Sequence, residues 1–496
     1  MQKKQTILVV ASLLVVVLSV TLAYFTAQII GKGKIVTINS ADLKIIFTDS
    51  DGSISGTNIE PGKWNVTKTF TIENKSNETY KYNIVIQDLV NTFVTEGYLQ
   101  YKITSTNGGY NMTEFKDVPK SETATDTILA YSVSISVGVT QSYTVEFKYA
   151  NDESVDQSND MGKKLSGTLF ITEGTEDPNK TLYNQLLVDK STKLTRTDFS
   201  KVLTDNNTNT LYTGVEDSKT VYYFAGNATD NWVKFGKNAS NQDLYWRIIR
   251  TNSDGSVRLL YHGTSTTTTD AYIGTSAFNS SYDNIAYVSY MYGSLGSISS
   301  ARENTNNSTI KTTIDNWYIS NLEAKGYTKY LSTTAVYCND RSISSDSINF
   351  GAFTRLGTNK TPSYDCAATE DKFTVDTSTG NGKLTYPIAL MTADEVSFAG
   401  GLYGANTPTW YYYNSVNGSS TGSKFWWLLS PLDSSTSGSS MFIVRGSSNP
   451  GRLNYNYVNS NNGVRPALSL KSCAKYSSGD GSAENPYTIK ETETGC

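Results

Sequence analysis

Residues 425–470 read FWWLLSPLDSSTSGSSMFIVRGSSNPGRLNYNYVNSNNGVRPALSL, with apolar ends around a polar middle. The runs 425–429, 441–444 and 464–470 have the apolar, branched and aromatic side chains of short buried strands. Between the last two runs, residues 445–463 are rich in Asn, Ser, Gly and Tyr and cannot form a core. Amides combined with rigid aromatic rings are typical of adaptable binding surfaces, so this segment is the first candidate for a ligand site.

The polar middle supplies the candidate ligand-binding residues, because Tyr offers contact area and Asn both donates and accepts hydrogen bonds. The alternative is a polar hairpin in which every second ring packs inward. The aromatic run 410–413 could extend the binding face or fill the core, whereas Arg465 opens the final strand and is expected to be buried and paired. The candidate residues are Asn449, Arg452, Asn454, Tyr455, Asn456, Tyr457, Asn459, Asn461 and Asn462.

Length and charge exclude some classes of function. A chain of 496 residues is too long for a single core and predicts two or three domains. Its net charge is only −4, and no segment is basic enough to neutralise phosphates, so nucleic acid is not an expected partner. The single histidine, His262, weakens any case for histidine-based catalysis and is expected at the end of a strand.

The sequence favours a protein that is not an enzyme. It has no His-x-x-x-His motif and no convincing carboxylate pair. A glycan-active enzyme with two distant carboxylates remains an alternative. Asp371 and Asp376 could form an oxygen-rich loop for calcium, but a solvated turn is the preferred interpretation. No metal and no cofactor are therefore predicted.

The four cysteines all lie in the C-terminal half, and none is in a Cys-x-x-Cys pair. An even number in an exported chain suggests two disulfides. Pairing of neighbours in sequence gives Cys338–Cys366 and Cys473–Cys496, although four cysteines allow three pairings.

The N-terminus has the pattern of an export signal. Lys3 and Lys4 precede the apolar run 7–23, and no charged residue follows until Lys32. Residues 1–30 are predicted to be a cleaved signal peptide or a retained anchor. In the second case the chain contacts the membrane only through residues 7–30.

Residues 35–173 are predicted to form an all-β sandwich, because short runs alternate polar and apolar residues between turn signals. The linker 174–215 is expected to hold a short helix capped by Asp177, with an apolar stripe of Leu182, Leu186 and Leu187, followed by a connector over 190–209. The expected strands of the sandwich are 35–38, 43–48, 66–73, 80–86, 99–104, 131–137, 143–149 and 165–172.

Three motifs carry a family resemblance for this half of the chain. Residues 23–27 read AYFTA, residues 41–43 read ADL, and Glu60-Pro61-Gly62 is followed by TFTIEN at 69–74. Together they resemble TasA- and camelysin-like secreted bacterial β-sandwich proteins. The resemblance implies export, processing by a dedicated signal peptidase and a sandwich fold. Because that family includes fibre-forming proteins, it also permits self-assembly, although a spacer domain is preferred.

Residues 216–490 are predicted to form an α+β domain. Strands are expected at 221–224, 244–249 and 257–261, with residues 226–241 as the turn between the first two. Ser430-Pro431 is expected to end the strand at 425–429.

Two helices are expected among these strands. One begins at Ser308 or Thr309, places residues 310, 314, 317 and 322 on one face, and ends at Gly326. The other begins with a capping box of Thr392 and Glu395 and ends at Gly400.

A second resemblance rests on four motifs in a fixed order. They are YWRII at 245–249, TADEV at 392–396, FWWLLSP at 425–431 and GVRPAL at 463–468. These motifs resemble an uncharacterised family of bacterial surface-protein domains, and the last two are similar to the end of C-type-lectin-like folds, including relatives of the formylglycine-generating enzyme. The resemblance implies that residues 445–462 lie on the binding face. The copper-binding cysteine pair of that enzyme and the calcium motifs of sugar-binding lectins have no match here.

The sequence as a whole predicts a multidomain protein, an all-β sandwich followed by an α+β C-type-lectin-like domain. The expected function is that of an exported bacterial cell-surface protein, adhesin-like and non-catalytic, which binds an extracellular glycan or protein. The first alternative is a fibre- or matrix-forming subunit, and the second is the glycan-active enzyme.

Overall fold

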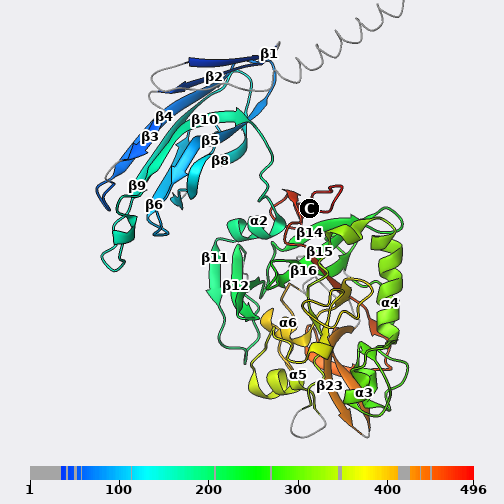
Figure 1. Ribbon diagram of the computed structural model, residues 1–496. Coiled ribbons are helices and arrows are strands. Elements are labelled where there is room, and N and C mark those ends of the chain that lie inside the picture. Colours follow the sequence, from blue (N-terminus) through cyan, green and yellow to red (C-terminus); the bar gives the residue numbers. More distant parts are fainter. Residues whose placement is uncertain are drawn as a thin grey trace, which may run out of the picture. The chain divides into compact units, whose positions relative to one another are not determined.

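The protein was analysed as a computed structural model, which describes residues 35–40, 43–49, 53–56, 59–112, 114–205, 208–268, 271–343, 349–411, 425–435, 437–446 and 449–496. The predicted signal or anchor at 1–30, and residues 412 and 413 of the aromatic run, lie outside these ranges. The chain divides into two compact units between Pro178 and Asn179 (Figure 1). The protein is therefore a β-rich multidomain protein, and each unit is described by itself.

The first unit is a sandwich of two antiparallel sheets, with strand orders β1-β2-β4-β9-β6-β7 and β3-β10-β5-β8. In β9, the side chains of Tyr143, Val145, Phe147 and Tyr149 are buried and alternate with more exposed residues, as a sheet with one face on the core requires. The strands are β1 (Ile35–Ser40), β2 (Leu43–Asp49), β3 (Ser53–Gly56), β4 (Asn65–Asn74), β5 (Tyr80–Asn91), β6 (Leu99–Ser105), β7 (Lys116–Asp117), β8 (Ser121–Ile135), β9 (Thr140–Tyr149) and β10 (Leu165–Glu173), with a short 3-10 turn, η1 (Ser158–Asp160).

All eight predicted strands of the sandwich are present, but the limits of β8 were predicted wrongly. The strand begins ten residues before the predicted start at 131, and its first half, SETATDT, is polar and exposed. Those residues pair with β5 through the backbone, for example Thr125 with Leu89. Backbone pairing leaves no hydrophobic pattern, so the sequence does not reveal this half of the strand.

The second unit contains a ten-stranded sheet and a five-stranded sheet. The larger sheet has the strand order β11-β12-β13-β15-β14-β29-β28; in addition, β16 pairs with β15 and β27, and β22 pairs with β27. The smaller sheet has the order β17-β26-β23-β24-β25. Their bounds are β11 (Thr192–Thr195), β12 (Thr210–Glu216), β13 (Lys219–Tyr223), β14 (Trp232–Lys237), β15 (Asp243–Thr251), β16 (Val257–Gly263), β17 (Thr275–Ser276), β22 (Ile388–Leu390), β23 (Trp426–Ser435), β24 (Gly438–Val444), β25 (Leu453–Tyr457), β26 (Asn462–Gly463), β27 (Pro466–Leu470), β28 (Tyr476–Ser478) and β29 (Tyr487–Ile489).

Helices and minor ribbons surround these sheets. The α-helices are α2 (Leu182–Asp189), α3 (Ile298–Ala301), α4 (Thr309–Tyr318), α5 (Gly351–Phe353) and α6 (Ala393–Phe398). The other turns are η2 (Ile285–Val288), η3 (Ile319–Glu323), η4 (Tyr327–Tyr330), η5 (Thr354–Asn359) and η6 (Thr369–Asp371), and the short ribbons pair β18 (Met291–Tyr292) with β19 (Asn306–Asn307) and β20 (Tyr337–Cys338) with β21 (Lys372–Phe373). None of the helices in the described ranges combines the length and the apolar character needed to cross a bilayer.

Both helices predicted in the second unit are confirmed. Ser308 caps α4 through a hydrogen bond from the Lys311 amide, and Gly326 follows in the left-handed conformation. The predicted face, which continues from α4 into η3 with Leu322, is buried except for Trp317, which is half-buried. Thr392 and Glu395 form the reciprocal capping box at the start of α6.

Several other boundaries predicted in the second unit and before it were wrong. Thr181, not Asp177, caps α2. The expected connector contains β11, and the expected turn at 226–241 contains β14. Pro431 lies inside β23, where the pairing with β24 is irregular. An irregularity in the ladder accommodates a residue without an N–H, so a proline there does not end the strand.

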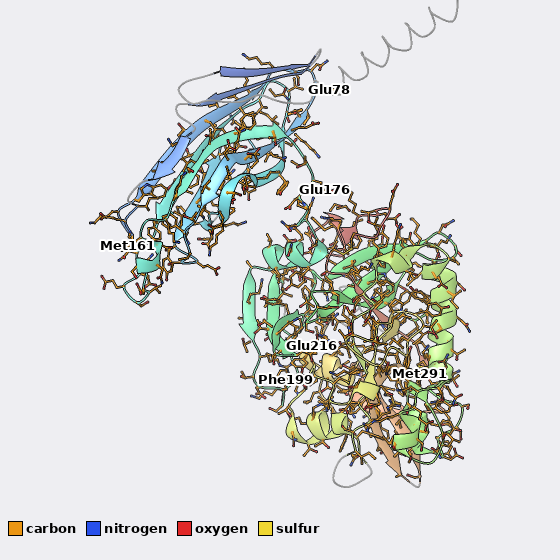
Figure 2. The ribbon with its side chains drawn as sticks, in the orientation of Figure 1. Glu78, Met161, Glu176, Phe199, Glu216 and Met291 are labelled. Atoms are coloured by element: carbon orange, nitrogen blue, oxygen red, sulfur yellow. A yellow bond between two sulfur atoms is a disulfide. The ribbon has the colours of Figure 1, made fainter. Side chains whose placement is uncertain are left out.

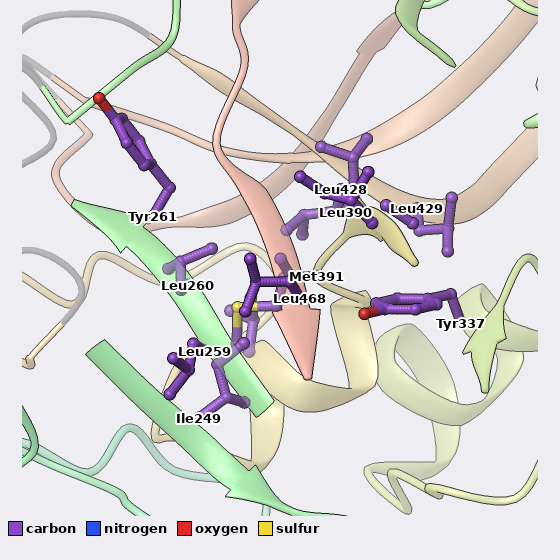
Figure 3. Close-up of a cluster of buried hydrophobic side chains, with 14 of the residues drawn as sticks. Ile249, Leu259, Leu260, Tyr261, Tyr337, Leu390, Met391, Leu428, Leu429 and Leu468 are labelled. Atoms are coloured by element: carbon purple, nitrogen blue, oxygen red, sulfur yellow. The ribbon is translucent and has the colours of Figure 1, made fainter. Parts of the chain in front are cut away.

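The core of the second unit forms where the two sheets meet the start of α6. Leu259 and Leu260 of β16 pack with Leu390, Leu428 and Leu468, as Figure 3 shows. His262, at the end of β16, is fully buried with its ring edge-on to Trp232. The predicted strand-end position of this histidine is confirmed.

Candidate functional site

Two of the predicted ligand-binding residues, Tyr455 and Tyr457, project from the edge strand β25. Their side chains are 40% and 42% exposed, and residues two apart in a strand point to the same face. Leu453, on the same face, is buried and pairs with Val444 of β24. In the alternative interpretation every second ring packs inward; the structure does not show this, because both rings remain exposed.

The asparagines of β25 close the outer edge of the sheet. The Tyr455 amide donates to the Oδ1 atom of Asn454 at 2.8 Å, and the Tyr457 amide donates to the Oδ1 atom of Asn456 at 3.0 Å. The carbonyl of Leu453 accepts a bond from the Gly404 amide. Because β25 is the last strand of its sheet, these bonds satisfy donors that would otherwise face solvent unpaired.

A third exposed ring joins the two tyrosines of β25. The ring centroid of Tyr282 lies 5.7 Å from that of Tyr457, and Tyr282 is 42% exposed. Gly438, the first residue of β24, lies beneath both rings. We call Tyr282, Tyr455 and Tyr457 the tyrosine face.

A carboxyl group lies beside the tyrosine face, and the sequence analysis did not identify it. Asp433 pairs with Ser440 across β23 and β24, and Ser440 pairs with Tyr457. Burial raises the pKa of Asp433, opposed by a hydrogen bond with Ser440. Burial also raises the pKa of the Tyr403 hydroxyl, with further contributions from Tyr455 and Asp433. Asp433 was missed because Ser430-Pro431 was expected to end the strand; a longer strand would have placed it on this face.

The other predicted ligand-binding residues are dispersed. Asn462 is buried and its Oδ1 atom accepts from the Asn456 amide at 3.3 Å, so both stabilise the turn after β25. The Arg452 Nε atom donates to the Oδ1 atom of Asn406 at 2.9 Å. Asn449 is half-buried, and Asn459 and Asn461 are exposed in the turn. The structure thus brings together the two tyrosines, but not all nine residues.

Replacing Gly438 with alanine is expected to disturb the tyrosine face. The φ angle of Gly438 is +137°, which disfavours other residues, and an added Cβ would meet the rings of Tyr282 and Tyr457. We expect a loss of about 1–3 kcal/mol of unfolding free energy, the cost of holding a residue other than glycine in a sparsely populated backbone region, and a changed tyrosine signal in near-ultraviolet circular dichroism. Gly296→Ala is the control, since its φ is +107° but no atom lies near its Cβ position; it should lose similar stability without the spectral change.

A buried cluster of charges is the second polar concentration in this unit. Glu395 accepts hydrogen bonds from the Arg250 Nε atom at 2.9 Å and the Arg258 Nη1 atom at 2.7 Å, and Arg250 also binds Glu216 at 2.7 Å. Next to it, Arg355 binds Asp394 and Asp340 at 2.9 and 2.7 Å. The cavity between these groups is about 10 Å³, enough for about one water molecule. The cluster is therefore structural and not a ligand site.

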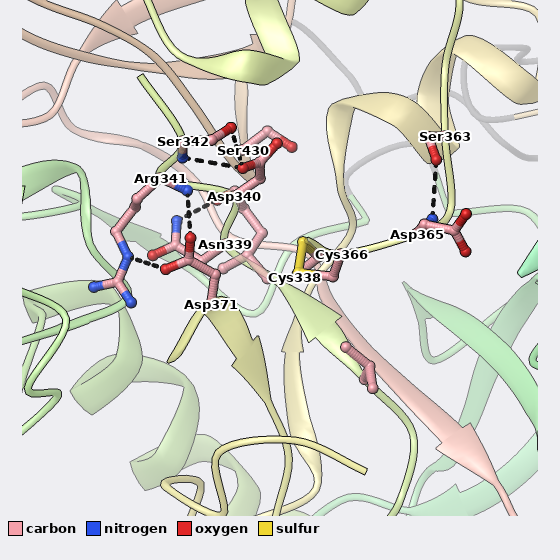
Figure 4. Close-up of a disulfide and its surroundings, with 12 residues drawn as sticks. Cys338, Asn339, Asp340, Arg341, Ser342, Ser363, Asp365, Cys366, Asp371 and Ser430 are labelled. Atoms are coloured by element: carbon pink, nitrogen blue, oxygen red, sulfur yellow. Dashed lines mark hydrogen bonds and ion pairs between the residues drawn. A yellow bond between two sulfur atoms is a disulfide. The ribbon is translucent and has the colours of Figure 1, made fainter. Parts of the chain in front are cut away.

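The cluster adjoins the first of two disulfides, Cys338–Cys366 and Cys473–Cys496, which confirm the predicted pairing. Figure 4 shows Asp371 beside Arg341 near this bond. Asp371 is fully buried and binds Arg341 and Arg302, each at 2.7 Å. The predicted solvated turn is wrong for Asp371, because two arginines compensate for its burial. In the described ranges, no group of three or more His, Cys, Asp or Glu residues could hold a metal ion.

Acid is expected to destabilise the second unit through Glu395. Burial alone would raise the pKa of this carboxyl, but Arg258, Arg250 and the Thr392 amide lower it from 4.5 to about 2. A lowered pKa contributes stability that is present above pH 4.5 and is lost as the pH falls towards 2; the shift corresponds to about 3 kcal/mol. Urea unfolding followed by tryptophan fluorescence at pH 7, 4.5, 3 and 2 measures this; constant stability below pH 4.5 would contradict it.

Arg465 is buried, as expected, with its guanidinium 4.9 Å from the Trp426 ring centroid and its Nε atom bonded to the Tyr261 carbonyl. Trp410 and Tyr411 are also buried, so this part of the aromatic run fills the core.

Comparisons with protein-family models, curated proteins and solved structures found no match.

Proposed function

We propose that the chain is an exported bacterial cell-surface protein that binds an extracellular glycan or protein through the tyrosine face, without catalysis. In this proposal the second unit is C-type-lectin-like, and the first unit is a spacer. The observation that carries it is the exposure of Tyr282, Tyr455 and Tyr457 together. They are the most exposed tyrosines in the described part of the chain.

The surroundings of the tyrosine face support recognition of a ligand. Tyrosine gives a large contact area with few rotatable bonds, so little entropy is lost on binding. The rings are supported by packing, since Tyr282 and Tyr457 contact each other above Gly438. The half-buried Asp433 places a carboxyl group beside the face.

The two disulfides support a location outside the cytoplasm. Disulfides persist in oxidising compartments and are rare where thiols are kept reduced. This agrees with export of the chain.

The double variant Tyr455→Ala/Tyr457→Ala is expected to fold normally and to lose binding on glycan and protein arrays. Truncation of central aromatic anchors costs about 2 kcal/mol or more each, at least about thirtyfold in affinity. Tyr455→Phe/Tyr457→Phe is the matched control, because it keeps both rings and should retain most of the affinity. Unchanged binding by the alanine variant would reject the tyrosine face as the site.

A further inference from the structure

The first unit contains a cavity of about 470 Å³, within the range of small-molecule sites. It lies between residues 59–61, which lead into β4, and the loop that joins β9 to β10. Figure 2 labels Met161 on this loop. The void in the charge cluster of the second unit, by contrast, measures only about 10 Å³.

The inner wall of the cavity is apolar. Phe93 and Tyr149 are almost fully buried, and their rings meet edge to face with centroids 5.2 Å apart. Ile59 and Pro61 form another side. The side chain of Met161 at the rim is 83% exposed, which is unusual for an apolar residue and gives an adaptable contact surface.

The loop that forms one wall is fixed by hydrogen bonds. The buried Asp160 carboxylate accepts from the Val94 amide at 2.6 Å, the Thr95 amide at 3.2 Å and the Tyr149 hydroxyl at 2.8 Å. The backbone of Lys164 also holds the loop to Thr92: its carbonyl accepts from the Thr92 amide at 3.0 Å, and its amide donates to the Thr92 Oγ1 atom at 2.8 Å. A ligand would therefore enter a preformed site, with little ordering cost.

The rim of the cavity carries two lysine side chains. Lys163 and Lys164 line it, and neither has an ion-pair partner within the described ranges. Two carboxylates also line the cavity: that of Glu60 is exposed and paired with Lys63 at 2.8 Å, and that of Asp160 is buried and accepts from the Val94 and Thr95 amides. The two lysines therefore remain as the cationic groups that an anionic group of the ligand could contact.

We infer that this cavity binds an amphiphilic carboxylate, with its apolar chain or ring against Phe93 and Met161 and its carboxylate at Lys163 and Lys164. Fatty acids and the apolar C-termini of peptides share this chemistry, and the titrations below distinguish the two sources. The first unit is then a second binding module, separate from the tyrosine face.

Calorimetric titration of the full chain with octanoate, decanoate and dodecanoate, each below its micellar concentration, tests the inference. Affinity should rise about fourfold for each added methylene group that enters the cavity. Dodecyltrimethylammonium has the same chain but the opposite charge, and should bind at least about tenfold more weakly than dodecanoate. N-acetyl-phenylalanine mimics the C-terminal end of a peptide. Saturable binding of this probe but not of dodecanoate would identify the ligand as a peptide, and saturable binding of dodecanoate alone would identify it as a lipid.

Two matched pairs of variants locate the binding. Lys163→Glu/Lys164→Glu should weaken dodecanoate binding by about tenfold, whereas Lys81→Glu/Lys116→Glu, which reverses two exposed lysines elsewhere on the unit, should not. Met161→Glu should weaken it, whereas Val155→Glu, at a partly exposed residue of the same loop that does not line the cavity, should not. Equal effects within either pair, equal affinity for the cationic probe, or binding of neither anion would overturn the inference. The tyrosine-face variants should leave these titrations unchanged, so the two proposals fail independently.

Discussion

The variant Glu395→Gln is expected to lower the free energy of unfolding of the second unit by about 3–5 kcal/mol. Glutamine nearly preserves the volume of the side chain, so the loss arises from charge. Arg250 and Arg258 would remain buried with one carboxylate, that of Glu216, in place of two. The Glu395 side chain also accepts the Thr392 amide at 2.9 Å, so the variant weakens the capping box of α6 as well.

Urea unfolding followed by tryptophan fluorescence is the appropriate measurement, because every tryptophan except Trp64 lies in the second unit. Glu484→Gln is the control, since this glutamate is exposed and should tolerate the change. A loss below about 1 kcal/mol for Glu395→Gln, typical of surface pairs, would show that water or other groups compensate for the arginine charges.

The second large effect is expected from Cys338→Ala/Cys366→Ala, which removes the disulfide beside the charge cluster. The bond closes a loop with a sequence separation of 28 residues, for which the chain-entropy model gives about 3 to 4 kcal/mol. The loop carries Arg355, which binds Asp394 outside it. These contacts should hold the loop in place when folded, so the effect should arise mainly in the unfolded chain.

Urea unfolding of this variant should have a midpoint between that of the oxidised wild-type protein and that of the wild-type protein under reducing conditions, which break both disulfides. Cys473→Ala/Cys496→Ala removes the other bond, whose separation of 23 residues predicts a similar loss, and serves as the comparison. A stability equal to that of the oxidised wild-type protein would contradict the expected role of the Cys338–Cys366 bond.

Elements with a strong apolar pattern could be predicted from the sequence, and those formed by backbone pairing could not. The helix α4 and the capping box of α6 were found because their signals are local: Ser308, Gly326, Thr392 and Glu395 each lie at a terminus. The strand β11 was missed because its four residues are exposed and polar in pattern. Its existence depends on parallel pairing with β12, which single-sequence patterns do not encode.

The candidate site was predictable in part for the same reason. Tyr455 and Tyr457 stand in a segment whose composition is itself the signal. Tyr282 and Asp433 join them only through tertiary packing and strand pairing. Besides its role in the capping box, Glu395 forms a buried ion pair with Arg250. This ion pair could not be predicted from the sequence, because the two residues are 145 positions apart.

The asparagine side chains of β25 also limit how copies of this chain could associate. Each one already occupies the main-chain donor of the tyrosine that follows it. An extended peptide approaching this margin would find those N–H groups engaged, and could not add a further strand without displacing both amides. Any polymer of this protein built by strand addition should therefore grow from a different edge, which leaves the phenol rings accessible to a ligand in every copy.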